Sequence, residues 1–232
     1  MKQTLLDRYI RWCEAGSAGV HVYGYMRDVL KQTTPVMHIW PKLGPFEPAK
    51  LPGKEIDWPM AAMCLGSHEP YTLDPDWDLT ISKLAVNEDL SMFTGYTWQL
   101  SGVLIFQLSA TEFEVIPLIT SVIKDVVFTE IQLSYKLENG EWKATFAETG
   151  PVNNTFYKVV LNKVTPEKAY GYPEKLDKLV NTVTSYLAAF HNYLKDKPVT
   201  TVHPAKEGKY KIKDGQVKKV YRPATMGHIE YT

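Results

Sequence analysis

Secondary structure is specified most sharply by one stretch, Ile131-Gln-Leu-Ser-Tyr-Lys-Leu-Glu-Asn-Gly-Glu-Trp-Lys-Ala-Thr-Phe146. Asn139-Gly140 is the preferred two-residue type I′ turn, because both central positions of that turn need a positive φ. A hairpin closed by this turn has a polar face and an apolar face, and the apolar face pairs Leu137 with Trp142, Tyr135 with Ala144, and Leu133 with Phe146. A slip of one residue would destroy this separation, so the sequence predicts both the hairpin and its register.

Further strands and one ambiguous segment flank this hairpin. The apolar run at residues 96–108 is typical of a buried strand, and residues 156–164 are predicted to add a third strand to an antiparallel meander. Residues 111–124 fit two structures. One is a helix with Pro117 near its start, and the other is a strand, because valine and isoleucine favour strands.

Two segments show the period of an amphipathic helix. At residues 174–194 apolar side chains recur along one face, and Pro173 suits the start of the helix. Residues 3–15 carry a shorter apolar stripe, with Thr4 as the candidate N-cap.

Prolines and large aromatic residues are concentrated between residues 35 and 75. Eight of the fifteen prolines lie there, and they disfavour long regular elements. Aromatic residues such as Trp40 and Trp58 indicate a packed, irregular segment over the core, because disordered segments are poor in aromatics. The sequence therefore predicts an α+β fold in which an antiparallel meander sheet packs against a long C-terminal helix, with a proline-rich irregular segment.

The composition is that of a globular protein that needs no cross-link. The 232-residue chain is 44% hydrophobic and 22% charged, with a formal net charge of zero, and it can bury a substantial core. No apolar run approaches the roughly 18 residues that cross a bilayer, so no membrane association is predicted. Cys13 and Cys64 form no disulfide framework, which favours a reducing, cytoplasmic location.

The C-terminal end departs from this charge balance. Residues 201–232 carry seven basic and three acidic residues, and residues 1–200 carry a compensating acidic excess of four. This asymmetry predicts two units, an α+β domain at 1–200 and a basic hairpin with a C-terminal tail at 201–232. Asp214-Gly215 is a second type I′ turn signal, and its register pairs Ile212 with Val217, Tyr210 with Lys219, and Lys211 with Lys218.

The lysines of this hairpin allow two interpretations. On an exposed face they would bind an anionic partner, either nucleic acid or an acidic host protein, whereas on an edge strand they would only block aggregation. For the first interpretation the candidate binding residues are Lys209, Lys211, Lys213, Lys218, Lys219, Arg222 and His228.

Motifs for catalysis or cofactor binding are not recognisable in the sequence. The alternating acids Asp74, Asp76 and Asp78 are not followed by the glycine and glutamate of a calcium loop. The six histidines show no metal-ligand spacing, so neither a metal site nor a cofactor is predicted. Whether the protein is an enzyme stays open, and a dispersed catalytic site would draw on His68, Asp74, Asp76, Asp78 and His228.

The last residues, Tyr221-Arg-Pro-Ala-Thr-Met-Gly-His-Ile-Glu-Tyr-Thr232, resemble the Gly-His-containing endings of uncharacterised proteins encoded by tailed phages and mobile elements. Arg222, Gly227, His228 and Tyr231 carry the resemblance, whereas Met226 and Ile229 replace an arginine and a tryptophan that are usual there. The resemblance implies a small soluble phage protein of unknown activity in the host cytoplasm.

These features together predict a soluble, non-enzymatic binding or regulatory protein that engages nucleic acid or a host protein through its basic hairpin. Two alternatives remain. One is an enzyme with a dispersed site of histidine and aspartate, and the other is a structural or assembly protein whose aromatic proline-rich segment forms the interface.

Overall fold

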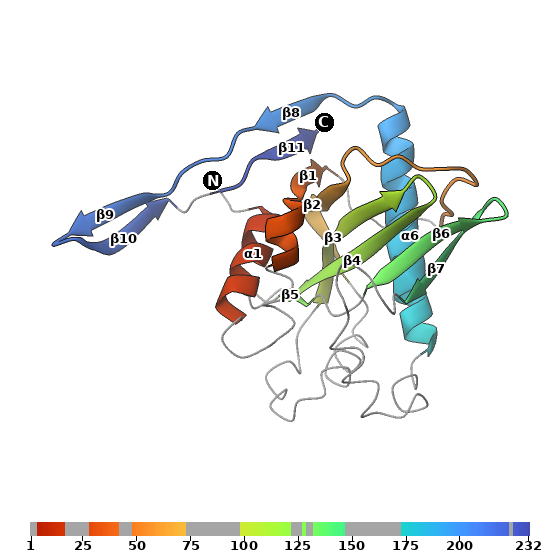
Figure 1. The fold of residues 1–232 in the computed structure, drawn as a ribbon, viewed down its shortest axis with the longest axis horizontal. Helices are drawn as coiled ribbons and strands as arrows, with labels where there is room; N and C mark the ends of the chain where they lie inside the picture. Colours follow the sequence, from red (N-terminus) through yellow and green to blue (C-terminus); the bar gives the residue numbers. More distant parts are fainter. Residues whose placement is uncertain are drawn as a thin grey trace.

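A mixed β-sheet forms the centre of the molecule (Figure 1). The computed structural model describes residues 4–16, 28–41, 48–72, 98–121, 127–128, 132–146, 173–222 and 225–232. The described helices are α1 (Leu5–Gly16), α6 (Pro173–Lys195) and a helical stretch at residues 28–33.

The described strands are, in chain order, β1 (Val36–Trp40), β2 (Ala62–Thr72), β3 (Trp98–Ser109), β4 (Glu112–Ser121), β5 (Val127–Phe128), β6 (Leu133–Glu138), β7 (Glu141–Phe146), β8 (Thr200–His203), β9 (Lys209–Lys213), β10 (Gln216–Arg222) and β11 (His228–Tyr231). In the main sheet they are arranged in the order β7-β6-β4-β3-β2-β1-β11-β8, and β5 pairs with β4. β9 and β10 pair with each other as a separate two-stranded ribbon.

The predicted fold class is wrong, because the sheet is not an antiparallel meander closed by a C-terminal helix. β1 runs parallel to both of its neighbours, β2 and β11. β11 comes from the last residues of the chain and lies between β1 and β8, so α6 is followed by two further strands of the same sheet. Parallel strands are joined by long connections instead of tight turns, so this pairing leaves no local signal in the sequence.

The predicted boundary at residue 200 falls at the first residue of β8. β11, at the end of the predicted C-terminal unit, pairs with β1 over Met37–Ile39.

Both faces of the sheet are covered. Residues of α1, including Leu6, Tyr9 and Cys13, pack into one buried cluster with Leu104 and Phe106 of β3. The alternate β3 residues, Val103 and Ile105, belong to a second cluster with Leu179, Val183, Tyr186 and Phe190 of α6. Burial on both faces explains why β3 is a continuous apolar run instead of an alternating one.

α1 begins with the predicted cap. The backbone N–H of Asp7 donates to Thr4 Oγ1 at 3.1 Å, while the Thr4 backbone N–H and hydroxyl donate to Asp7 Oδ2 at 2.9 and 2.7 Å. This reciprocal arrangement is a capping box with aspartate in place of glutamate, and it satisfies donors that the first helical turn leaves free.

The hairpin predicted at residues 131–146 is confirmed with its register. β6 and β7 pair Leu133 with Phe146, Tyr135 with Ala144, and Leu137 with Trp142, with no irregularity. Asn139 and Gly140 both have positive φ, 51° and 78°, as a type I′ turn requires.

Of the two structures that the sequence allows at residues 111–124, the strand is observed as β4. It pairs with β3 along most of its length and with β6 over Glu112–Val115. Pro117 lies opposite Val103 of β3, in the part of β4 between the residues that pair with β6 and those that pair with β5. A proline is tolerated in a strand where one side of the ladder is unpaired.

The proline-rich segment contains regular structure that the sequence analysis does not predict. β1 and β2 both lie within it and occupy the middle of the sheet. Residues 48–61, between these strands, are irregular and lie against α6, where the backbone N–H of Ala49 donates to Ser185 Oγ at 3.1 Å. Pairing with distant strands, which no local pattern reports, overrides the proline content.

Two predicted features lie outside the described residues, namely the strand at residues 156–164 and the acids Asp74, Asp76 and Asp78. Among the helices of the described ranges, none has both the length and the apolar character needed to cross a membrane.

Candidate functional site

The C-terminal strands form a long ribbon that leaves the edge of the sheet. β8 and β11 pair antiparallel, with His203 opposite His228. Three residues further along each strand, Lys206 bridges to Thr225, and after three more Lys209 pairs with Arg222. The ribbon therefore keeps one register from the sheet edge into the β9–β10 hairpin, which we call the basic arm (Lys209–Arg222).

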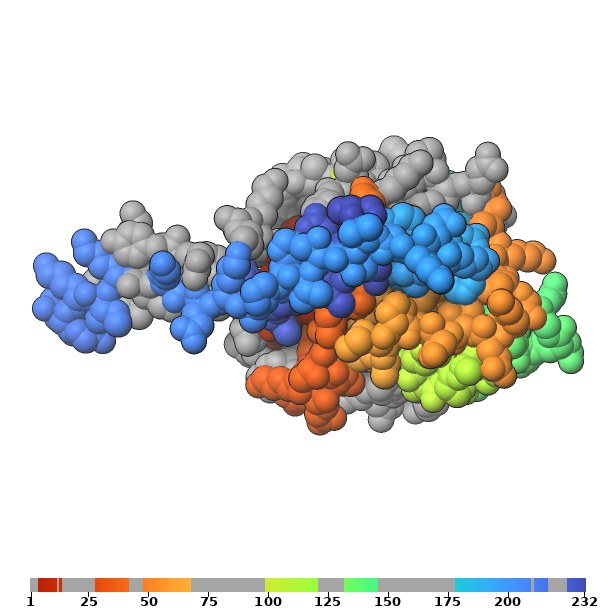
Figure 2. All heavy atoms as spheres, turned by 90° about the horizontal axis from the view of Figure 1, so that it is seen from above, coloured from red at the N-terminus to blue at the C-terminus, as the bar shows by residue number. Residues whose placement is uncertain are grey.

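The basic arm projects away from the rest of the molecule (Figures 1 and 2). Lys209, Lys211 and Lys213 alternate along β9, and all three are exposed. Alternate residues of a strand point to the same face, so β9 presents these three ammonium groups on one side of the ribbon. Within the described residues, none of the three forms an ion pair with a carboxylate.

The other predicted cations of the arm lie on β10. Lys219 pairs with Lys211, and Arg222 pairs with Lys209. The predicted pairing of Ile212 with Val217 is confirmed, but the predictions for Tyr210 and Lys211 are wrong. A register shift between Val217 and Lys219 places Val220 opposite Tyr210 and Lys219 opposite Lys211. The bulge adds one residue to β10, and bulges increase strand twist.

The seventh predicted binding residue, His228, does not belong to the basic arm. It lies on β11 at the base of the ribbon, where its ring stacks on that of His203, with centroids 4.4 Å apart and planes 13° apart. His203 Nε2 lies 2.9 Å from Glu230 Oε2. One ligand atom from each of these three residues lies within 4.8 Å of the others. We call this group the histidine cluster (His203, His228 and Glu230).

The histidine cluster is partly shielded from solvent. The side chains of His203 and Glu230 are 32% and 31% exposed. Nδ1 of His228 is buried and makes no hydrogen bond of full geometry to the described residues, although the ring lies against the Met226 backbone. Desolvation by burial, followed by the nearby His203, lowers the pKa of His228, which favours its neutral form.

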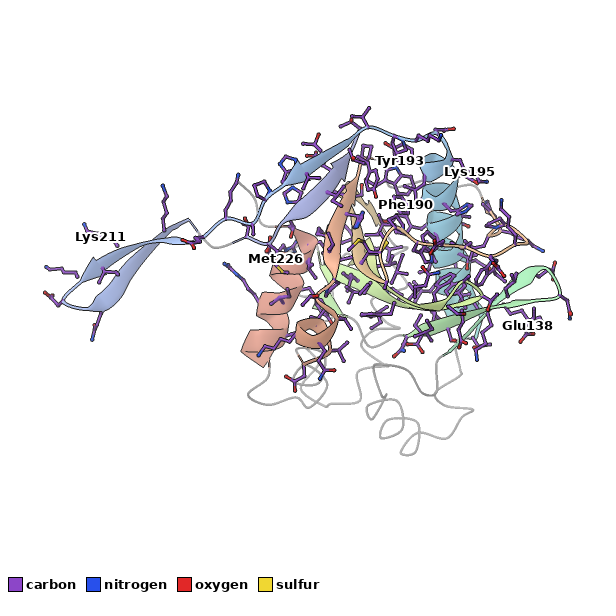
Figure 3. The ribbon with its side chains drawn as sticks, turned by 45° about the horizontal axis from the view of Figure 1, so that its top comes forward. Glu138, Phe190, Tyr193, Lys195, Lys211 and Met226 are labelled. Atoms are coloured by element: carbon purple, nitrogen blue, oxygen red, sulfur yellow. The ribbon has the colours of Figure 1, made fainter. Side chains whose placement is uncertain are left out.

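The N-terminus of α1 is tied to the base of the ribbon. The backbone N–H of Met226 donates to Asp7 Oδ1 at 2.8 Å, and Figure 3 shows Met226 where the ribbon passes α1. A cavity of about 670 Å³ lies between these elements, and its lining includes Asp7, Arg11, Glu207 and Met226. Because Asp7 also caps α1, one carboxylate fixes both the helix and the ribbon.

The described residues do not bring the candidates for a dispersed catalytic site together. His228 is the one member of that set whose side chain is described, while His68 is placed only through the backbone of β2. The neighbouring thiol of Cys64 is fully buried, and burial raises its pKa, which disfavours the thiolate needed by a nucleophile. Trp40 and Trp58 of the aromatic segment are also buried, where both pack against Phe190.

Comparisons with known proteins give no relative from which a function could be inferred. No family model matches the sequence, and neither the curated proteins nor the solved structures contain a match.

Sequence reasoning missed His203 and Glu230. The spacing of His228 and Glu230 by two residues would have placed both on one face of a strand. The contribution of His203, 25 residues before His228, becomes visible only from the pairing of β8 with β11.

Proposed function

We propose that this protein binds nucleic acid through its basic arm, without catalysing a reaction. The observation that carries the proposal is the placement of exposed lysines on a ribbon that extends beyond the body of the molecule. Polyanions gain affinity from such groups, because each neutralised phosphate releases condensed counterions.

The spacing of the lysines supports a polyanion with regularly repeated charges. Alternate residues of an antiparallel strand are about 6.8 Å apart, twice the rise per residue. Phosphates repeat at regular intervals along a DNA strand, so a row of evenly spaced ammonium groups can contact several of them. Contacts of this kind read the backbone and not the base sequence, so we expect binding with little sequence preference.

The setting inferred from the C-terminal resemblance is consistent with this proposal. A phage protein in the host cytoplasm, which is the origin and location that we propose, would meet nucleic acid as its most abundant polyanion. An acidic host protein is the competing partner, and a pull-down with nuclease treatment separates the two.

The test is a salt titration of binding to fluorescently labelled duplex and single-stranded DNA. Six cations of the arm, if all contact phosphates, predict a slope of log K against log salt of about −5. Replacing Lys209, Lys211, Lys213, Lys218 and Lys219 by glutamine should abolish most of the binding and reduce the slope to about −1.

A matched control variant replaces five exposed lysines of the body by glutamine, namely Lys31, Lys54, Lys178, Lys195 and Lys197. This variant has the same net charge as the arm variant and should retain most of the affinity and the slope. Equal losses in both variants would show that only net charge matters. A pull-down partner that survives nuclease treatment and requires the arm, without DNA binding, would replace nucleic acid by an acidic protein.

A further inference from the structure

We propose that His203, His228 and Glu230 form a binding site for a divalent transition metal of the Zn²⁺ class at the base of the basic arm. This inference does not depend on the proposed function. It rests on three residues that share one face of the β8–β11 ribbon and that come from two strands.

The strand geometry brings these three side chains together. His203 and His228 are direct partners across the antiparallel pair, and directly opposed residues project to the same face. Glu230 lies two residues after His228 and therefore shares that face. One carboxylate and two imidazoles thus converge because of backbone register and not because of an accidental approach of loops.

The donor set matches the chemistry of zinc. Zn²⁺ binds imidazole nitrogen and carboxylate oxygen at about 2.0–2.2 Å, and two histidines with one glutamate form a known type of ligand set. Tetrahedral ligands at that distance are about 3.4 Å apart. The cluster places its ligand atoms within 4.8 Å of one another, and His203 Nε2 already lies 2.9 Å from Glu230 Oε2. The two imidazole rings would have to rotate out of their stacked arrangement to direct a nitrogen each at one ion.

Asp7 lies at the base of the ribbon but does not belong to the donor set, because both of its carboxylate oxygens accept hydrogen bonds, from Thr4 and from the Met226 backbone. Three protein ligands leave the fourth tetrahedral position to water or to an added ligand.

A bound metal would cross-link β8 to β11 where the arm begins. It would add a cross-link between two strands that pair over four residues at the sheet edge and continue to the Lys206–Thr225 bridge. The site is therefore expected to stiffen the base of the arm and to stabilise the attachment of β8.

The experiment titrates the full chain with Zn²⁺ alone, by calorimetry and by competition with a chromophoric chelator. We expect one equivalent to bind and the melting temperature to rise, with no effect of excess Mg²⁺, which prefers octahedral oxygen ligands. His203→Gln, His228→Gln and Glu230→Gln should each weaken binding at least tenfold, while His191→Gln on α6, as the control, should leave it unchanged.

A second measurement does not depend on how the variants fold. Paramagnetic Cu²⁺ added to the unaltered protein should first broaden the amide resonances of residues 201–203 and 228–230. Saturable binding that persists in the His203→Gln/His228→Gln double variant would overturn the proposal. So would broadening centred elsewhere, or the absence of saturable Zn²⁺ binding to the unaltered chain.

Discussion

Two hairpins with nearly the same turn chemistry lie at opposite ends of this molecule. β6 and β7 are joined by Asn139-Gly140, and β9 and β10 by Asp214-Gly215. Glu138 and Lys211 mark the two hairpins in Figure 3. Both turns adopt positive φ at both central positions, with 51° and 78° in the first and 54° and 72° in the second. The turn sequence therefore sets the local backbone equally well in both places.

The hairpins differ in how their strands pair beyond the turn. β6 and β7 keep a regular register through six pairs, whereas β9 and β10 change register twice. Tyr135 of β6 is buried, stacks on Phe113 at a centroid distance of 4.9 Å, and reaches Thr184 of α6 with its hydroxyl. Ile212 of β9 is 67% exposed. A buried face penalises any slip, and without one a bulge costs little, so packing and not the turn maintains a register over distance.

The largest expected difference comes from removing one apolar side chain from each region. Phe113→Ala should lower the free energy of unfolding by about 3–5 kcal/mol, because Phe113 is fully buried among Tyr135, Trp142 and Trp58. Ile212→Ala on the arm should change it by less than about 0.5 kcal/mol. Urea denaturation followed by tryptophan fluorescence measures both. Similar losses would mean that the arm packs on the body in solution.

A second difference concerns the pH dependence of stability, because the body buries titratable groups next to the β6–β7 hairpin. Burial raises the pKa of Glu114 from its ordinary 4.5 to about 7, so the folded state binds this proton more tightly than the unfolded state. Stability from this group is therefore complete below about pH 4.5 and is lost as the pH rises through 7, by at most about 3 kcal/mol.

His38 acts in the opposite direction. Burial lowers its pKa from 6.5 to about 4, so stability is lost as the pH falls from 6.5 towards 4. Glu114→Gln should remove the first effect, leave stability that rises with pH between 4 and 6.5, and raise stability at pH 8. Thermal melts across this range, with Glu112→Gln on the same strand as the control, check the prediction. An unchanged profile in Glu114→Gln would contradict it.

A smaller difference is expected from the turns themselves. Gly140→Ala and Gly215→Ala each place a Cβ at positive φ, which costs about 1 kcal/mol locally. Only Gly140→Ala should lower the free energy of global unfolding, because β7 belongs to the main sheet and the arm does not. Amide hydrogen exchange should detect the Gly215 change as faster exchange confined to the arm. Equal changes in the denaturation midpoint would show that arm and body unfold together.

The smallest effect on stability is expected from the charges of the arm. Lys209→Gln, Lys211→Gln and Lys213→Gln together should alter the free energy of unfolding by less than about 0.5 kcal/mol, since these side chains are exposed and unpaired with carboxylates in the described residues. The same triple variant should bind DNA markedly more weakly. A stability loss comparable to that of Phe113→Ala would mean that the lysines serve the fold and not a partner.

The candidate site is only partly predictable from the sequence. The lysines of β9 and the turn that closes the arm can be predicted from local pattern, because alternation and an Asp-Gly turn act within a few residues. His228 is a candidate on the sequence alone because of its place in the C-terminal tail. Its neighbours His203 and Glu230, with which it forms the histidine cluster, depend on the pairing of β8 with β11.

The sequence by itself determined the features whose causes are local. These are the capped start of α1, the period of α6, the β6–β7 register and the turn that closes the basic arm, each decided by turn geometry, capping or one-dimensional periodicity. Tertiary structure alone decided the parallel pairing of β1 with β2 and β11, and the insertion of the last strand beside one of the first. The physical reason is that burial on both faces, between α1 and α6, selects strand order through contacts between residues far apart in the chain, and no short window of sequence reports such contacts.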